Sequence, residues 1–177
     1  MRKWLAVTGL FALVFSVGGC AQERRYTQPS SAMEPTIRAG ENFAADLGAY
    51  KRSAPQRGDV VVFRHEGVLE VKRVIAISSD TVQGKDFKIF LNGNLLTEIY
   101  IQHLANAGTI SYSVSYLKDF GPVRVSTGQV FVMGDNRDYS HDSRDPNFGT
   151  IPIQDVVGKA ARIAASPEAQ RVDTAIR

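Results

Sequence analysis

Short runs of apolar and β-branched residues, bounded by turn signals, recur along most of this 177-residue chain. Such runs cover 59–64, 68–77, 109–116 and 129–133. At 88–98, Asn92-Gly93 separates two apolar-rich arms, which is a strong hairpin signal. Only 155–165 is equally compatible with a strand and a helix. The chain is therefore expected to form a mostly antiparallel β-fold with a partly open barrel or sandwich-like core.

Composition limits the domain count and the class of partner. With 44% hydrophobic residues, a chain of this length can bury one core and form one domain. We place this domain at 30–165, followed by a polar tail at 166–177. The net charge of +3 is small and there is no long Lys/Arg run, so a nucleic-acid partner is not expected. A single cysteine excludes an internal disulfide.

Residues 1–20 have the pattern of a signal peptide or membrane anchor. A basic start at Arg2 and Lys3 precedes an uncharged apolar run that ends at Cys20. The run is shorter than a typical spanning helix, and the junction VGGC is similar to a bacterial lipobox. We expect a lipidated Cys20, with a short membrane anchor as the alternative. Either places the domain on the outer or periplasmic side of a bacterial membrane, with 21–29 as a tether.

Lys72 is a candidate base because it lies in the apolar run 68–77. In a strand, Glu70, Lys72 and Val74 share one face. Burial there disfavours the charged ammonium, and a general base needs the neutral amine. The alternative is an edge lysine that extends its amine to water.

The segment 134–144 reads GDNRDYSHDSR and is the most specific motif of the chain. Its closely spaced Asp and Arg residues can form charge-assisted pairs that stiffen a turn. A calcium loop is the rival interpretation, but Ser143 and Gly149 occupy the positions where such a loop needs glycine and a bidentate glutamate. No metal site is expected. His65, His103 and His141 flank no GxSxG-type motif, so none is expected to be a catalyst.

These segments, together with SSAMEPTI at 30–37, resemble in sequence and order the boxes of type I signal peptidases, membrane-bound serine proteases that use a Ser–Lys pair. The family's first box runs Ser-x-Ser-Met-x-Pro-Thr, and its second serine is the nucleophile. Here that position is Ala32. The second box normally ends in Gly-Asp, where this chain has Ser79-Asp80. The resemblance covers about residues 28–162.

The resemblance implies a role for each matching residue. Lys72 would be the general base, Ser140 would orient it, and the Ser30 hydroxyl and the backbone N–H at 32 would hold the oxyanion. The residues that would give structural support are Asp135, Asn136, Arg137, Asp142, Ser143 and Arg144. The substrate pocket would be lined by Met33, Ile37 and Val71. No cofactor is implied, and the substrates would be exported preproteins or similar signal-peptide segments.

Ala32 leaves two hypotheses open, since a methyl group cannot attack a carbonyl. Loss of such a nucleophile typically costs on the order of a millionfold in rate. A displaced hydroxyl, at Ser31 or less readily Ser30, could substitute. If the box is extended, Ser31 points away from Lys72 and needs a local bulge to reach it. Otherwise the chain is a pseudo-peptidase that binds extended apolar segments by β-augmentation.

Overall fold

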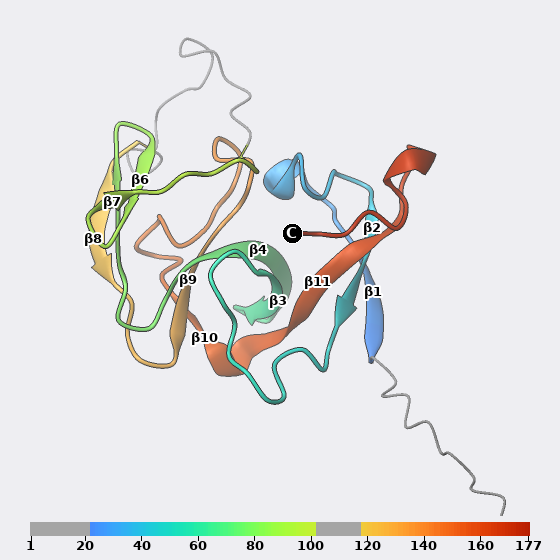
Figure 1. Cartoon of the computed structure of the whole chain (residues 1–177), viewed down its shortest axis with the longest axis horizontal. Helices are drawn as coiled ribbons and strands as arrows, with labels where there is room; N and C mark the ends of the chain where they lie inside the picture. The colour runs from blue at the N-terminus through green and yellow to red at the C-terminus, as the bar shows by residue number, and fades with distance from the viewer. Residues whose placement is uncertain (1–21, 102–117) are drawn as a thin grey trace, which may run out of the picture.

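The computed structural model describes residues 22–101 and 118–177, which form two antiparallel sheets (Figure 1). The predicted strand at 109–116 and the predicted leader at 1–20, with Cys20, lie outside these residues. In the described ranges the helical segments are single 3-10 turns, and none has the length or hydropathy of a membrane span. They are η1 (Ser31–Met33), η3 (Ile153–Asp155) and η4 (Ala169–Arg171).

The larger sheet has seven strands in the order β1-β2-β11-β3-β4-β9-β10. They are β1 (Glu23–Thr27), β2 (Asn42–Asp46), β3 (Val60–His65), β4 (Val68–Ile77), β9 (Gln129–Met133), β10 (Ile151–Pro152) and β11 (Val156–Ala165). All neighbouring strands are antiparallel, and β1 and β10 end the order, so the sheet is not a closed barrel. The predicted fold class is confirmed. The ambiguous segment at 155–165 forms a strand, β11.

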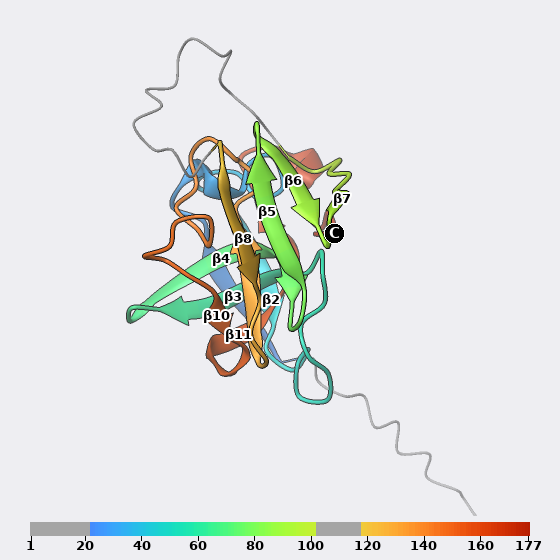
Figure 2. The same ribbon diagram turned by 90° about the vertical axis from the view of Figure 1, so that its left-hand side faces the viewer.

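The smaller sheet has the order β7-β6-β5-β8 and lies beside the larger one (Figure 2). Its strands are β5 (Thr81–Lys85), β6 (Lys88–Leu91), β7 (Asn94–Leu95) and β8 (Phe120–Arg124). The β6–β7 turn has φ of 52° at Asn92 and 81° at Gly93. Both angles are positive, as in the type I′ hairpin turn that Asn-Gly favours. The predicted hairpin is confirmed.

Strand β4 is the central element of the core, because Val71 through Ala76 are buried on both of its faces. Val71 belongs to one apolar cluster with Met33 and Ile37, Val74 to a second, and Ile75 to a third that reaches the smaller sheet. Burial on both faces explains why 71–76 shows no alternation of apolar and polar residues.

Ser79, two residues after the end of β4, has a φ of 75°, in the left-handed region that favours glycine. This is the position where the family's second box has Gly. The conformation that glycine would supply is therefore kept here by a serine. The next residue, Asp80, fixes the turn by accepting hydrogen bonds from Arg57 and the Ile77 N–H.

Both segments predicted to flank the domain belong to it. The predicted tether at 21–29 contains β1, which pairs with β2 along its whole length. The predicted tail at 166–177 folds back on β11, and Ile176 is buried in the cluster that contains Met33.

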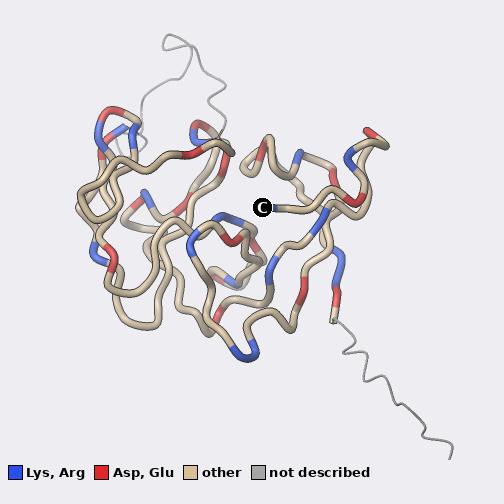
Figure 3. Tube along the Cα trace, in the orientation of Figure 1, with Lys and Arg blue, Asp and Glu red and all other residues tan. Residues whose placement is uncertain are grey.

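Figure 3 shows basic and acidic residues interspersed along the described chain.

Candidate functional site

The first box forms a tight 3-10 turn rather than an extended segment. Ser30 is the N-cap, and its Oγ accepts a hydrogen bond from the Ala32 N–H at 3.4 Å. The two groups expected to hold an oxyanion are therefore neighbours. Because the box is a turn, the alternation argument that directed Ser31 away from Lys72 does not apply.

The motif at 134–144, the third box of the family, holds this turn through hydrogen bonds to its backbone. Asn136 donates its N–H to the Ala32 carbonyl at 3.1 Å and its Nδ2 to the Ser31 carbonyl at 3.2 Å. At Gly134 a Cβ would lie 2.3 Å from Ser140 Oγ and 2.5 Å from the Ala32 carbonyl oxygen. Only glycine permits so close an approach between the two boxes, which is why the first and third boxes meet here.

Lys72 is buried as predicted, but its partner differs from the prediction. Its Nζ donates to Glu70 Oε2 at 2.9 Å, and only 7% of its side chain is exposed. Ser140 was expected to bind this amine. Instead, its buried Oγ forms no hydrogen bond within the part of the chain that the structure describes. In this state the lysine is held by a carboxylate and not by a hydroxyl.

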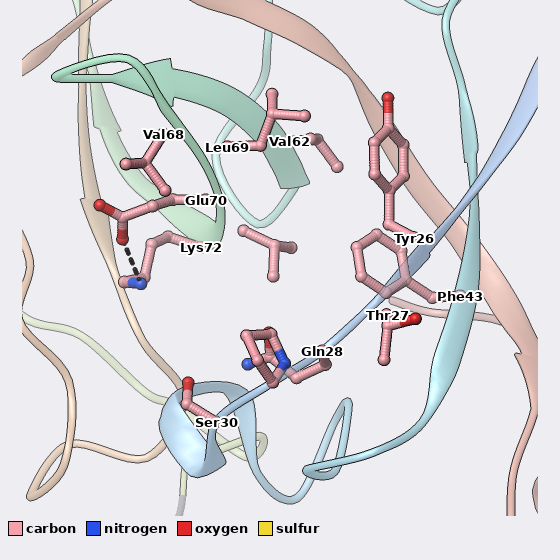
Figure 4. Close-up of a pocket in the computed structure, with 12 residues that line it drawn as sticks. Tyr26, Thr27, Gln28, Ser30, Phe43, Val62, Val68, Leu69, Glu70 and Lys72 are labelled. Carbon is pink, nitrogen blue, oxygen red and sulfur yellow. Dashed lines mark hydrogen bonds and ion pairs between the residues drawn. The ribbon is translucent and has the colours of Figure 1, made fainter.

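Lys72 and Ser30 lie on opposite walls of a pocket of about 280 Å³, and both side chains end in it (Figure 4). Val71, expected in a substrate pocket, also lines this pocket. Ser31 is absent from the lining. Most of the wall is apolar or uncharged. Besides Ser30 and Lys72, the lining consists of Tyr26, Thr27, Gln28, Pro29, Phe43, Val62, Val68, Leu69, Glu70 and Val71.

Met33 and Ile37 do not reach this pocket, contrary to the prediction. Both are fully buried in the core cluster, because the 3-10 turn directs their side chains inward beneath the box. They support the floor of the site and are not available to a ligand.

Two strand edges border the pocket. Strand β1 is the last strand of its sheet. Residues Val68–Lys72 of β4 pair with β3 on one side, and pairing with β9 on the other begins only at Arg73. In the described residues, no strand covers either edge beside the pocket. We call the space between these two edges the groove. One side of the groove is β1 with the residues that follow it up to Ser30, and the other side is Val68–Lys72.

Arg73 is the residue of this site that the sequence reasoning missed. Its guanidinium is buried and binds Asp135 through two hydrogen bonds, Nε to Oδ1 at 2.8 Å and Nη2 to Oδ2 at 2.7 Å. Thr36, from the first box, donates to the same carboxylate at 2.5 Å. This cluster joins all three boxes in one buried network.

The remaining charges of the third box are also paired. Asp142 and Arg144 bind each other, as the spacing predicts. Burial alone would raise the pKa of Asp142, but the Arg144 guanidinium outweighs it and lowers that pKa. Arg137 instead binds Glu98, from the segment after β7, at 2.7 Å through Nη1. Ser143 supports the strand beside them by accepting the Val132 N–H.

The segment 166–177 adds a partly buried ion pair next to the first box. Arg171 binds Glu41 at 2.5 Å and donates to the Thr36 carbonyl at 3.1 Å. Burial raises the pKa of Glu41, but hydrogen bonds from Arg171, the Arg38 N–H and Ser166 together outweigh it and lower that pKa to about 2.

This ion pair predicts a loss of stability in acid. A carboxyl whose pKa is lowered in the folded state stabilises that state above pH 4.5, and the contribution disappears as the pH falls to about 2. We expect a loss of about 2–3 kcal/mol from this group. Denaturant unfolding at pH 6 and pH 2 measures it, and Glu41→Gln should reduce the difference by that amount. An equal fall in parent and variant would contradict the assignment.

Comparison with known proteins addresses the resemblance directly. Residues 1–164 match the family model described as signal peptidase, peptidase S26. The chain belongs to this family. A signal peptidase I of Mycobacterium tuberculosis is 33% identical over 215 residues, covering 94% of this chain and 73% of the relative. The signal peptidase I of Bacillus licheniformis is 36% identical over 135 residues, covering 75% and 72%.

Among solved structures, the crystal structure of a signal peptidase I from Enterococcus faecalis aligns with a TM-score of 0.47 at 34% identity, covering 59% of this chain and 95% of that chain. The family predicted from the three boxes is therefore confirmed by the family model and the relatives. Residues beyond 164, including Arg171, extend past the part that the S26 family model matches.

Proposed function

We propose that this signal peptidase family member binds an extended segment of an exported preprotein in the groove and does not cleave it. The observation that carries the proposal is a peptide-sized groove with strand edges on both sides and a methyl group at position 32. An extended peptide can satisfy free strand edges through its own backbone, while apolar walls accept small side chains.

The chemistry of a Ser–Lys peptidase explains what is missing. A neutral lysine takes the hydroxyl proton, and the serine oxygen attacks the peptide carbonyl. The amine then leaves, and water hydrolyses the acyl ester. Ala32 has no proton to give and no oxygen to attack with. The Ser30 hydroxyl and the Ala32 N–H lie near each other, which supports a retained oxyanion side of the site.

A second candidate function is slow cleavage through another serine of the box. Ser30 is favoured over Ser31 because only Ser30 lines the pocket that contains Lys72. If this candidate is correct, the parent cleaves a signal-peptide substrate and Ser30→Ala abolishes the cleavage. Activity lost in Ser31→Ala instead would assign the attack to Ser31, and Lys72→Ala should remove activity in either case.

Binding in the groove is tested with a labelled peptide that spans a signal-peptide cleavage site. Leu69 lies on the groove wall and is 37% exposed, so Leu69→Glu should fold while placing a charge against the peptide. We expect peptide affinity to fall at least tenfold, as measured by fluorescence anisotropy. The matched control is Leu95→Glu on β7, where the leucine is 57% exposed and outside the groove. Equal affinities for the two variants would refute groove binding.

The basic start, the apolar run and Cys20 support a place in the bacterial envelope, with the domain on the periplasmic or outer side of a membrane. A lipid on Cys20 or a short anchor would keep the groove close to emerging preproteins. Cell fractionation tests this placement, and recovery of the chain in the cytoplasm would contradict it.

A further inference from the structure

Glu70 lies between two basic side chains on the wall of the groove. Its Oε2 accepts the Lys72 Nζ hydrogen bond at 2.9 Å, and its Oε1 lies 3.6 Å from Nδ1 of His65. Glu70 and Lys72 are two positions apart on β4, so both side chains project from the same face, as Figure 4 shows. The carboxylate therefore contacts the one amine that the family's chemistry would use.

His65 is fixed by contacts that leave Lys72 as the main donor to this carboxylate. Its ring stacks on Phe148 with centroids 4.0 Å apart, and its Nε2 lies 3.2 Å from the Phe148 carbonyl oxygen. A carbonyl oxygen only accepts, so Nε2 carries the proton of that contact. The 2.9 Å between Lys72 Nζ and Oε2 is shorter than the 3.6 Å between His65 Nδ1 and Oε1, so Lys72 is the closer contact of this carboxylate.

We propose that Glu70 is a positioning residue that withholds Lys72 from the hydroxyl positions of the first box. Accepting a serine proton requires a free lone pair on Nζ. In the ion pair the amine is an ammonium, which has no lone pair, and its Nζ is held against Glu70 while the Ser140 Oγ stays without a hydrogen-bond partner among the described residues. The amine must therefore lose a proton and turn away from Glu70 before it can act as a base. This proposal rests on the proposed function, because it describes a second block on cleavage beside the missing oxygen at position 32.

The prediction is a gain of activity, which damage to the fold would not produce. In an Ala32→Ser background, Glu70→Gln should raise kcat for signal-peptide cleavage at pH 7 at least tenfold and leave KM within about twofold. The matched control is Glu66→Gln in the same background, since Glu66 is an exposed glutamate at the β3–β4 turn. Equal kcat for the Glu70 and Glu66 variants would overturn the proposal.

A second measurement does not depend on turnover. The parent chain and its Glu70→Gln and Glu66→Gln variants are treated with a small amine-reactive acylating reagent, and acylation of Lys72 is followed by peptide mass spectrometry. We expect at least fivefold faster acylation of Lys72 in Glu70→Gln than in the other two proteins. Equal rates would overturn the role of Glu70. Absence of cleavage in Ala32→Ser would instead mean that the site has lost more than its attacking oxygen, and the acylation rates would still decide on Glu70. The proposed function itself fails separately, if the parent does not bind the peptide in the groove.

Discussion

Replacing Ala32 with serine is expected to create a peptidase from this chain, with signal-peptide cleavage about a thousandfold faster than in the parent. The new hydroxyl would extend a buried methyl group beside the Ser30 hydroxyl and the N–H at 32, the two groups that we propose would hold the oxyanion. Loss of a nucleophile costs on the order of a millionfold in coupled catalytic groups. The gain should be smaller than this, because Glu70 still binds the Lys72 amine.

The control for this prediction is the double variant Ala32→Ser with Lys72→Met, which keeps the new hydroxyl and removes the base. It should cleave no faster than the parent. Cleavage is followed by chromatography of the peptide products. If Ala32→Ser binds the peptide with parental affinity but remains inert, the site has lost more than its attacking oxygen, and the account of a preserved oxyanion side would be wrong.

Replacing Asp135 with asparagine should have the largest effect on stability. The change leaves the buried Arg73 guanidinium without its carboxylate, and breaking a buried ion pair by removing one partner costs about 3–5 kcal/mol. That is a large share of the 5–15 kcal/mol that typically separates folded from unfolded protein. Denaturant unfolding at pH 7 measures the loss.

Asp86→Asn is the matched control for Asp135→Asn. Asp86 forms an exposed ion pair with Lys118 at 3.2 Å, and its positive φ of 49° suits asparagine. This variant should unfold at the same denaturant concentration as the parent. A loss in Asp135→Asn no greater than that in Asp86→Asn would mean that the buried network does not hold the three boxes together.

Local patterns were sufficient to predict much of the fold. Strands β3, β4 and β9 and the Asn92-Gly93 hairpin follow from β-branched runs and turn chemistry, which depend on near neighbours in sequence. The segment 166–177 reads as a polar tail because the contacts that hold it reach residues far away in sequence. Arg171 reaches Glu41, and Ile176 enters the core.

The site was predictable where the motif itself forms the contact. Asp142 and Arg144 are two residues apart and bind each other. The partner of Asp135 is Arg73, 62 positions earlier, and no local signal connects them. Strand alternation placed Glu70 on the same face as Lys72, but only the structure showed that the carboxylate binds the amine.

The most direct test of binding without cleavage is mass spectrometry of the parent chain after incubation with an excess of a peptide that it binds. The expected result is intact peptide and a protein of unchanged mass, together with a measurable complex under native conditions. Peptide fragments, or an acyl adduct that maps to Ser30 or Ser31, would contradict the account and show that another hydroxyl performs the attack that Ala32 cannot.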